Sequence, residues 1–406
     1  MPRNRVLAII QAGGSGGRMD VLTRERAKPA LPFAGVYQLV DFPLSNLAHS
    51  GISEVWLSLQ YQGATLQEPV ANGRPWDLDR TRGGLRLLLP QEGTGSEDEE
   101  GFAQGNADEL FRIRDQIRGA ESEQVIVLSA DHVYRFDFDD ALETHRRHGA
   151  ECTIVTTEVD LDEAGEHATV EADEDGRVTG FAYKPEDPST GTVATEIFVY
   201  DAAVLISVLE DLHRELTGKA DPGDSGLGDF GESLVPRFVD RGKTVAHAMS
   251  GYWRDLGQPH HYLAAHQDIL LDDQGLFGDL DWPILTRQPQ RVPARVLAGG
   301  TVEDSLVSPG ARVHGQVQRS VLGPGVVVEE GAVVRNSVVF ADCLVEKGAS
   351  LDWAIVDEGS VVSTGSVVGR PDADGTGDPD QVTIIGKDSR VSQSLDQGAR
   401  LEPGTT

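Results

Sequence analysis

The N-terminal stretch carries glycines and two cations in an arrangement that suits a polyphosphate ligand. An apolar run, residues 6–10, leads into a turn made of Gly13, Gly14, Ser15, Gly16 and Gly17. Arg18 ends this turn, and Lys28 follows ten residues later. Glycines let the backbone approach phosphate oxygens and donate its N–H groups to them, while Arg and Lys supply positive charge. The alternative is a surface turn without a ligand, because the sequence matches neither a P-loop nor a dinucleotide fingerprint.

Two aspartates are candidate ligands of a magnesium ion. Asp131 follows the apolar run 125–129, and Asp255 lies in the segment GYWRDLG, residues 251–257. Mg²⁺ prefers one or two carboxylates together with phosphate oxygens and water. For either aspartate alone, a helix cap or a turn is an equally good interpretation. Together with a phosphate-binding turn, the pair favours metal-assisted transfer at phosphorus.

Further polar residues are candidates for binding or for structural roles. Lys184 precedes Pro185, which restricts the turn, so the lysine is a possible phosphate ligand, with an ordinary surface lysine as the alternative. Asn106 stands at the start of a helical stretch and is interpreted as a possible cap. The histidines show no metal-binding spacing and are interpreted as structural: His132, His247, His260 and His261.

The elements that must position these residues alternate between strands and helices. Strands are predicted at residues 6–10, 55–59, 125–129, 153–157 and 197–200, and helices at 107–118, 139–147 and 259–271. This alternation predicts an α/β domain with a mostly parallel sheet that is covered on both faces. Ligands of such sheets bind beyond the carboxyl ends of the strands. The glycine turn and Asp131 both fall at that edge.

The amino-acid composition and the hydrophobic pattern change near residue 296. From there to residue 369 the chain is rich in Val, Gly and Ser, and apolar triplets recur at 305–307, 320–322, 337–339 and 354–356. Such a hexapeptide rhythm predicts a parallel β-helix, with a last coil at 382–401. An ordinary β-sandwich fits this regular spacing poorly. The predicted domains are therefore residues 1–280 and 296–406, joined by a linker at 281–295.

The composition of the chain argues against several classes of protein. The formal net charge of -31 argues against nucleic-acid binding, which requires a basic surface. Cys152 and Cys343 are the only cysteines, so neither a disulfide framework nor a cysteine-rich metal site is predicted. No apolar run approaches the length of a membrane helix, and Met1-Pro2-Arg3 does not begin a signal peptide. We therefore expect a cytoplasmic enzyme that does not act at a membrane.

Taken together, the motifs resemble those of the ADP-glucose pyrophosphorylases (glucose-1-phosphate adenylyltransferases), and they follow the same order. They are AGGSGGRM (12–19), RAKPALPF (26–33), DFPLSN (41–46), GNADEL (105–110), ADHVY (130–134), KP (184–185), DFG (229–231) and GYWRDLG (251–257). The resemblance covers essentially the whole chain. It implies a Rossmann-like nucleotidyltransferase domain followed by a left-handed β-helix. It also implies that the adenylyl group of ATP is transferred to a sugar 1-phosphate with Mg²⁺, for glycogen or α-glucan synthesis.

The resemblance also implies roles for individual residues. Gly13, Gly14, Ser15 and Gly16 would hold the ATP phosphates, with Arg18 and Lys28 stabilising the departing pyrophosphate. Gln60 and Gly105 would contact the adenine, and Asp131 and Asp255 would hold the metal. Lys184, Tyr183 and Ala194 would line the sugar-phosphate site. An allosterically regulated homotetramer is the expected assembly.

The sugar half departs from the family pattern. The departures are Gln11, Gly17, Phe102, Ala103, Tyr183, Ala194 and Glu196. Lost hydroxyl-binding groups change discrimination between substrates strongly. Two alternatives to the glucose 1-phosphate enzyme therefore stay open: a nucleotidyltransferase for another sugar 1-phosphate, and a non-catalytic regulatory paralogue.

Overall fold

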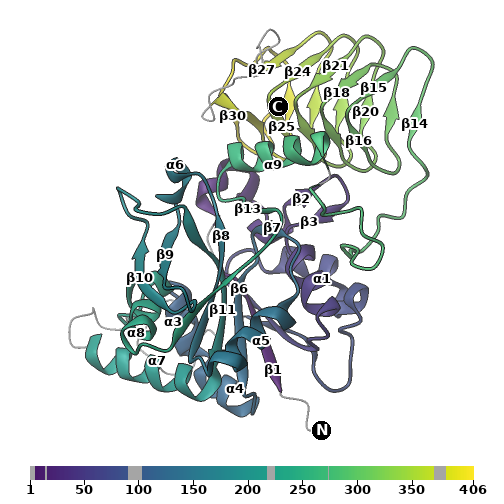
Figure 1. The fold of residues 1–406 in the computed structure, drawn as a ribbon. Coiled ribbons are helices and arrows are strands. Elements are labelled where there is room, and N and C mark those ends of the chain that lie inside the picture. The colour runs from purple at the N-terminus through teal and green to yellow at the C-terminus, as the bar shows by residue number, and fades with distance from the viewer. Residues whose placement is uncertain (1–4, 14–15, 90–102, 217–224, 273, 370–380) are drawn as a thin grey trace.

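The computed structural model describes residues 5–13, 16–89, 103–216, 225–272, 274–369 and 381–406. It consists of an α/β domain and a β-helix stacked on it, with helix α9 (Pro259–Leu271) between the two (Figure 1). No helix in these ranges is long and apolar enough to cross a membrane.

The α/β domain is built on a nine-stranded mixed sheet. Its parallel part has the order β6-β1-β4-β5, and it consists of β6 (Gln124–Ser129), β1 (Val6–Ala12), β4 (Glu54–Leu59) and β5 (Gly84–Leu88). The long strand β11 (Thr192–Asp201) runs antiparallel to β6 and joins this part to β8 (Cys152–Glu158), β9 (Ala168–Ala172) and β10 (Val178–Tyr183). β12 (Thr244–Ala248) is parallel to β8. The five predicted strands are confirmed as β1, β4, β6, β8 and β11.

Burial of both faces explains why these strands are continuously apolar. Along β1, Ala8 and Ile10 pack into one hydrophobic cluster, whereas Leu7 and Ile9 pack into the cluster on the opposite face. A strand buried on two sides needs apolar residues at every position and not at alternate ones. The glycine turn that follows β1 therefore begins at the edge of a sheet buried on both faces.

Helices cover the sheet, with one difference from the prediction. α5 (Phe138–His148) and α9 match the predicted helices, and α1 (Asp41–His49) and α7 (Ala202–Leu216) are additional. The predicted helix 107–118 is wrong as a single element. It is divided into α3 (Asn106–Arg112) and α4 (Arg114–Gly119), because Ile113 between them has φ −95° and ψ 5°, outside the helical range.

The C-terminal domain is a three-sided parallel β-helix. One side follows β16 (Leu306–Val307), β19 (Val321–Leu322), β22 (Val338–Val339), β25 (Ala354–Val356), β28 (Thr383–Ile385) and β30 (Arg400–Leu401). The other two sides run from β14 (Arg295–Val296) to β29 (Arg390–Val391) and from β15 (Thr301–Glu303) to β27 (Val367–Gly369). The predicted last coil is confirmed, since β28 and β30 extend the stack.

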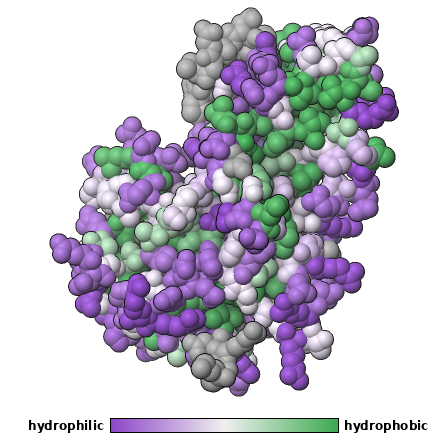
Figure 2. Space-filling model, turned by 45° about the vertical axis from the view of Figure 1, so that its right-hand side comes forward, coloured by the Kyte–Doolittle hydropathy of each residue, from purple (hydrophilic) through white to green (hydrophobic). Residues whose placement is uncertain are grey.

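The two domains share one hydrophobic cluster. Tyr262 and Leu263 of α9 pack in it together with Val338, Phe340 and Ile355 of the β-helix. Other apolar side chains gather over the β-helix on the face shown in Figure 2. Because the shared cluster is continuous, the β-helix and the α/β domain bury part of each other's surface.

Candidate active site

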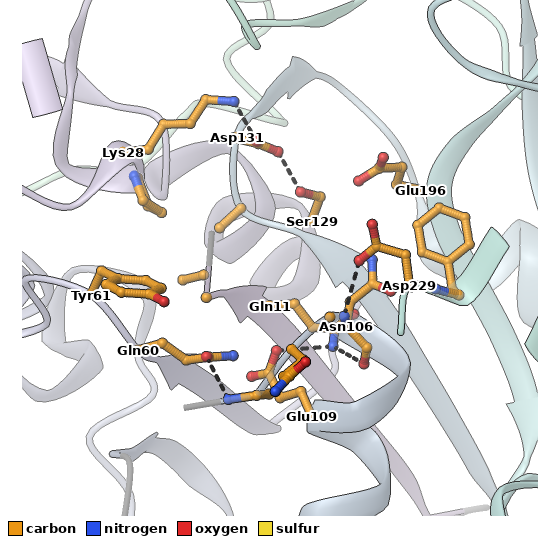
Figure 3. A pocket seen from close by; sticks show the side chains of 18 of the residues that line it. Gln11, Lys28, Gln60, Tyr61, Asn106, Glu109, Ser129, Asp131, Glu196 and Asp229 are labelled. Atoms are coloured by element: carbon orange, nitrogen blue, oxygen red, sulfur yellow. Dashed lines mark hydrogen bonds and ion pairs between the residues drawn. The ribbon is translucent and has the colours of Figure 1, made fainter. Parts of the chain in front are cut away.

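A cavity of about 430 Å³ opens beyond the carboxyl ends of β1 and β6, where ligands of α/β sheets bind (Figure 3). Eight predicted site residues line it: Gly13, Arg18, Lys28, Gln60, Gly105, Asp131, Tyr183 and Lys184. Gly14, Ser15 and Phe102 lie outside the described residues. The other predicted residues, Gly16, Ala194 and Asp255, do not line the cavity.

The glycine turn has a steric reason for its composition. A Cβ atom on Gly13 would come within 2.5 Å of Gln60 Nε2, so a side chain there would collide with the cavity wall. Gly16 has φ +67°, a left-handed conformation that favours glycine, and its carbonyl accepts a hydrogen bond from Thr23 Oγ1 at 2.8 Å. Arg18 follows and is exposed, with no ion pair to any described residue. Its guanidinium is free to contact an anion in the cavity.

Lys28 and Asp131 form the charged centre of the site. Lys28 is 7% exposed, and its Nζ lies 2.5 Å from Asp131 Oδ2. The hydroxyl of Ser129 donates to the other oxygen of the same carboxylate. Burial by itself would raise the pKa of Asp131, but Lys28 and His132 outweigh it and hold this pKa well below its usual range. Asp131 is therefore a carboxylate at neutral pH.

Asp255 reaches this centre through a short antiparallel pair of strands. β13 (Trp253–Asp255) pairs with β7 (His132–Tyr134), and Asp255 lies opposite His132 in the register. Asp255 Oδ1 is 4.0 Å from Lys28 Nζ. This oxygen is buried and accepts no hydrogen bond from any described residue. A buried carboxylate oxygen that lacks a hydrogen-bond donor is suited to bind a divalent cation. This agrees with the prediction that Asp131 and Asp255 hold a metal ion.

His132 also belongs to the site, so its interpretation as purely structural is incomplete. Its side chain is 2% exposed, and its Nε2 lies 3.4 Å from Asp131 Oδ1 and 3.5 Å from Asp255 Oδ1. Burial lowers the pKa of this imidazole, but the neighbouring carboxylates raise it by more. Spacing along the chain could not reveal this group, because Asp131 directly precedes His132 whereas Asp255 comes from the distant strand β13.

One end of the cavity has the character of a base-binding pocket. Gln60 accepts a hydrogen bond from the backbone N–H of Ala103 at 2.9 Å. Gly105 packs so closely that a Cβ would come within 2.3 Å of the Gly228 carbonyl. Two residues of this end were not predicted as ligands: Gln11 Nε2 donates to Glu109 Oε2 at 3.1 Å, and burial raises the pKa of Glu109 to about 7.

The opposite end carries Tyr183 and Lys184. The Tyr183 hydroxyl donates to Asp229 Oδ2 at 3.2 Å. Lys184 has a left-handed φ of +47°, and its backbone N–H donates to the His167 carbonyl at 3.0 Å. This backbone conformation is costly for a residue other than glycine, which is typical of a functional site.

Ala194, predicted for this same end, is instead buried in the core. It is 2% exposed and packs in the hydrophobic cluster beneath the sheet. The register of β11 against β8 shifts between Ala194 and Phe198, and this irregularity brings Glu196 to the cavity in its place. Glu196 and Phe198, and not Ala194, are therefore the residues of β11 that line the cavity.

Comparisons of the sequence with known proteins find matches over both domains. Residues 7–271 match the family model described as nucleotidyl transferase, and residues 291–393 match the model of a GlmU-like C-terminal hexapeptide domain. A glucose-1-phosphate adenylyltransferase of Bacillus cereus (strain Q1) is 34% identical over 373 residues, which is 91% of this chain and 96% of that protein. The enzyme of the same name from Clostridium perfringens (strain SM101 / Type A) is 33% identical over 371 residues, 91% and 93% of the two chains. The hexapeptide match agrees with the predicted left-handed β-helix.

Proposed function

Because the chain belongs to the nucleotidyl transferase family, together with the glucose-1-phosphate adenylyltransferases, we propose that it transfers the adenylyl group of ATP to glucose 1-phosphate. The products are ADP-glucose, for α-glucan synthesis, and pyrophosphate. The observation that carries the proposal is one cavity with the Lys28–Asp131 pair between Gln60 at one end and Lys184 at the other. Such an arrangement suits a nucleotide at the Gln60 end and a sugar phosphate at the Lys184 end.

The residues act mainly by positioning and by neutralising charge. A phosphate oxygen of the sugar attacks the α-phosphorus of ATP, and the bond to the bridging oxygen breaks so that pyrophosphate leaves. Lys184 orients the attacking phosphate, while Arg18 and Lys28 stabilise the negative charge on the leaving group. Mg²⁺, held by Asp131 and Asp255, would neutralise phosphate charge when bound. Gln60 and the backbone at Gly105 hold the base.

A second candidate substrate, another sugar 1-phosphate, is favoured by one observation. Tyr183 and Glu196 both line the sugar end, and the Tyr183 hydroxyl is already bonded to Asp229. A site that hydrogen-bonds a particular hydroxyl rejects sugars that lack it, so these side chains would change which sugar is accepted.

The test is pyrophosphate release from ATP with a panel of sugar 1-phosphates. We expect turnover with glucose 1-phosphate, and none in the Asp131→Asn variant with its fold intact by circular dichroism. Asp140→Asn, the same substitution at an exposed position on α5, is the matched control and should keep full activity. ATP binding without pyrophosphate release in the presence of any of the sugar 1-phosphates would instead favour the non-catalytic regulatory paralogue.

For the assembly we propose a cytoplasmic homotetramer that is regulated by an effector. Support comes from exposed apolar side chains around the linker and on the first coil: Leu280 (92%), Val292 (68%), Val296 (55%) and Leu306 (36%). Apolar surface of this kind is typical of an interface between subunits. Multi-angle light scattering of the purified chain tests this, and a clean monomer would refute it.

A further inference from the structure

Four side chains converge at the charged centre of the site: the two aspartates, His132 and Glu196. Single ligand atoms of Asp131, His132 and Glu196 lie within 4.8 Å of one another. Asp255 Oδ1 joins them through its 3.5 Å approach to His132 Nε2. The group therefore contains three carboxylates and an imidazole around one point.

Glu196 is held toward this point at a conformational cost. Its φ is +56°, a left-handed value that a glycine would adopt more easily, within the irregular part of β11. Its carboxylate accepts no hydrogen bond from any described residue and points toward Asp131 (Figure 3). A strained backbone that presents an unpartnered carboxylate to a cavity is typical of a ligand-binding position.

His132 is oriented as metal-binding histidines are. Its Nδ1 lies 3.1 Å from the Thr195 carbonyl, which can only accept a hydrogen bond, so Nδ1 carries a proton. Nε2 is left to face Asp131 and Asp255. Protein histidines that bind a metal commonly donate their other ring N–H to a backbone carbonyl in this way, which sets the tautomer.

Negative charges outnumber positive charges in this group, which favours the binding of a cation. Asp131, Asp255 and Glu196 contribute three negative charges when ionised, whereas Lys28 contributes one positive charge. A protonated His132 adds a second positive charge, so the buried group carries a net charge of about −1 with that proton and about −2 without it, and such a charge is costly unless it is compensated. A divalent cation that takes the place of the proton on Nε2 brings the net charge to zero.

We propose that His132 and Glu196 join Asp131 and Asp255 as ligands of this cation, and that the site takes a first-row transition ion in preference to Mg²⁺. The proposal rests on the cation site of the proposed function and adds two ligands to it. An imidazole nitrogen suits transition ions, whereas Mg²⁺ strongly prefers oxygen ligands. Mn²⁺ is the probe, because it is paramagnetic and accepts mixed nitrogen and oxygen ligands.

The experiment titrates Mn²⁺ alone into the full chain without ATP or sugar, and electron paramagnetic resonance measures free and bound metal. We expect a single site that binds Mn²⁺ more tightly than Mg²⁺, with pulsed spectra that show coupling to the ¹⁴N of an imidazole. Glu196→Gln should weaken Mn²⁺ binding about tenfold to a hundredfold, and His132→Gln should abolish the ¹⁴N coupling. Glu109→Gln, the same substitution at the other end of the cavity, should leave the affinity unchanged.

Glu196→Gly is a second variant of the same residue, chosen because it is expected to fold stably. Glycine accepts the left-handed φ without strain, so this variant should match or exceed the thermal stability of the metal-free parent while losing the Mn²⁺-dependent increase in Tm. Equal Mn²⁺ affinity in the parent and both Glu196 variants, or bound Mn²⁺ without ¹⁴N coupling, would overturn the inference. ADP-glucose formation is measured separately, so an active enzyme lacking these metal signatures would leave the proposed function standing.

Discussion

The guanidinium of Arg26 donates to the carboxylate of Asp357 at 2.7 Å across the boundary between the two domains. Their side chains are only 10% and 2% exposed. Arg26 stands two residues before Lys28, whereas Asp357 follows strand β25 of the β-helix. The β-helix therefore holds the segment that carries a predicted catalytic cation.

Arg26→Ala should destabilise the protein by about 3–5 kcal/mol, because it leaves the Asp357 carboxylate buried without its partner. The free energy of unfolding from urea titration measures this. Arg5→Ala breaks an exposed pair with Glu121, at 65% and 78% exposure, and should cost only about 0–1 kcal/mol. Equal losses in the two variants would contradict a structural role for the buried pair.

Lys28→Met should lower kcat about 10²- to 10³-fold, the usual effect of removing one preorganised group that stabilises transition-state charge. Steady-state pyrophosphate release measures it. Lys347→Met removes an exposed lysine that pairs with Glu330 on the β-helix, and it should leave kcat unchanged. A Lys28 variant with parental kcat would remove this lysine from the catalytic group.

Lys184→Gly should raise KM for the sugar 1-phosphate about 10- to 100-fold while KM for ATP stays constant, since a charged hydrogen bond to phosphate contributes about 1.5–3 kcal/mol. Glycine is chosen because φ at this position is +47°, so the charge is lost without added backbone strain. Initial rates with each substrate varied in turn separate the two constants. A rise in KM for ATP alone would contradict the assignment of Lys184 to the sugar phosphate and would indicate that it contacts the nucleotide.

Glu109→Gln should flatten the dependence of stability on pH. Burial raises the pKa of Glu109 in the folded chain to about 7, from an ordinary value of 4.5. The folded state therefore keeps a proton that the unfolded chain releases, and this stabilisation is full below pH 4.5 and is lost as pH rises through 7. The free energy of unfolding falls by about 3 kcal/mol over this range because of Glu109 alone.

The measurement is the free energy of unfolding between pH 4.5 and pH 8 for the parent and the Gln variant. The decline should be shallower in the variant, though not absent, because burial also raises the pKa of Asp41 to about 7. Parallel curves for the two proteins would show that Glu109 titrates normally in the folded state.

Features that depend on neighbouring residues were predictable. The continuous apolar runs of β1 and β6 predicted strands buried on both faces, and the recurring triplets near Val321 and Val338 predicted the stacked coils of the β-helix. Gly13 and Gly16 were recognised because glycine lets the backbone approach a phosphate closely, and the structure adds a positive φ at Gly16. In these cases the pattern and its structural cause lie within a few residues.

Other features of the site were not visible in the sequence. The break at Ile113 has no glycine or proline to mark it, and the irregularity of β11 exchanges Ala194 for Glu196 at the cavity without any turn signal. His132 adjoins Asp131 in the sequence, but no spacing links this pair to Asp255 or Glu196. Glu109 carries no signal in the sequence that sets it apart, because burial in the folded chain is what raises its pKa.

The two kinds of domain, the glycine turn and the identity of the charged residues could be read from the sequence alone, because periodicity and residue type are local properties of the chain. Which of those residues meet depends on the tertiary structure. Asp131 and Asp255 belong to one site because β13 pairs with β7, and Glu196 reaches them because its strand bulges. Contacts between distant segments depend on strand register and on how the layers pack, and neither is written in any single stretch of the chain.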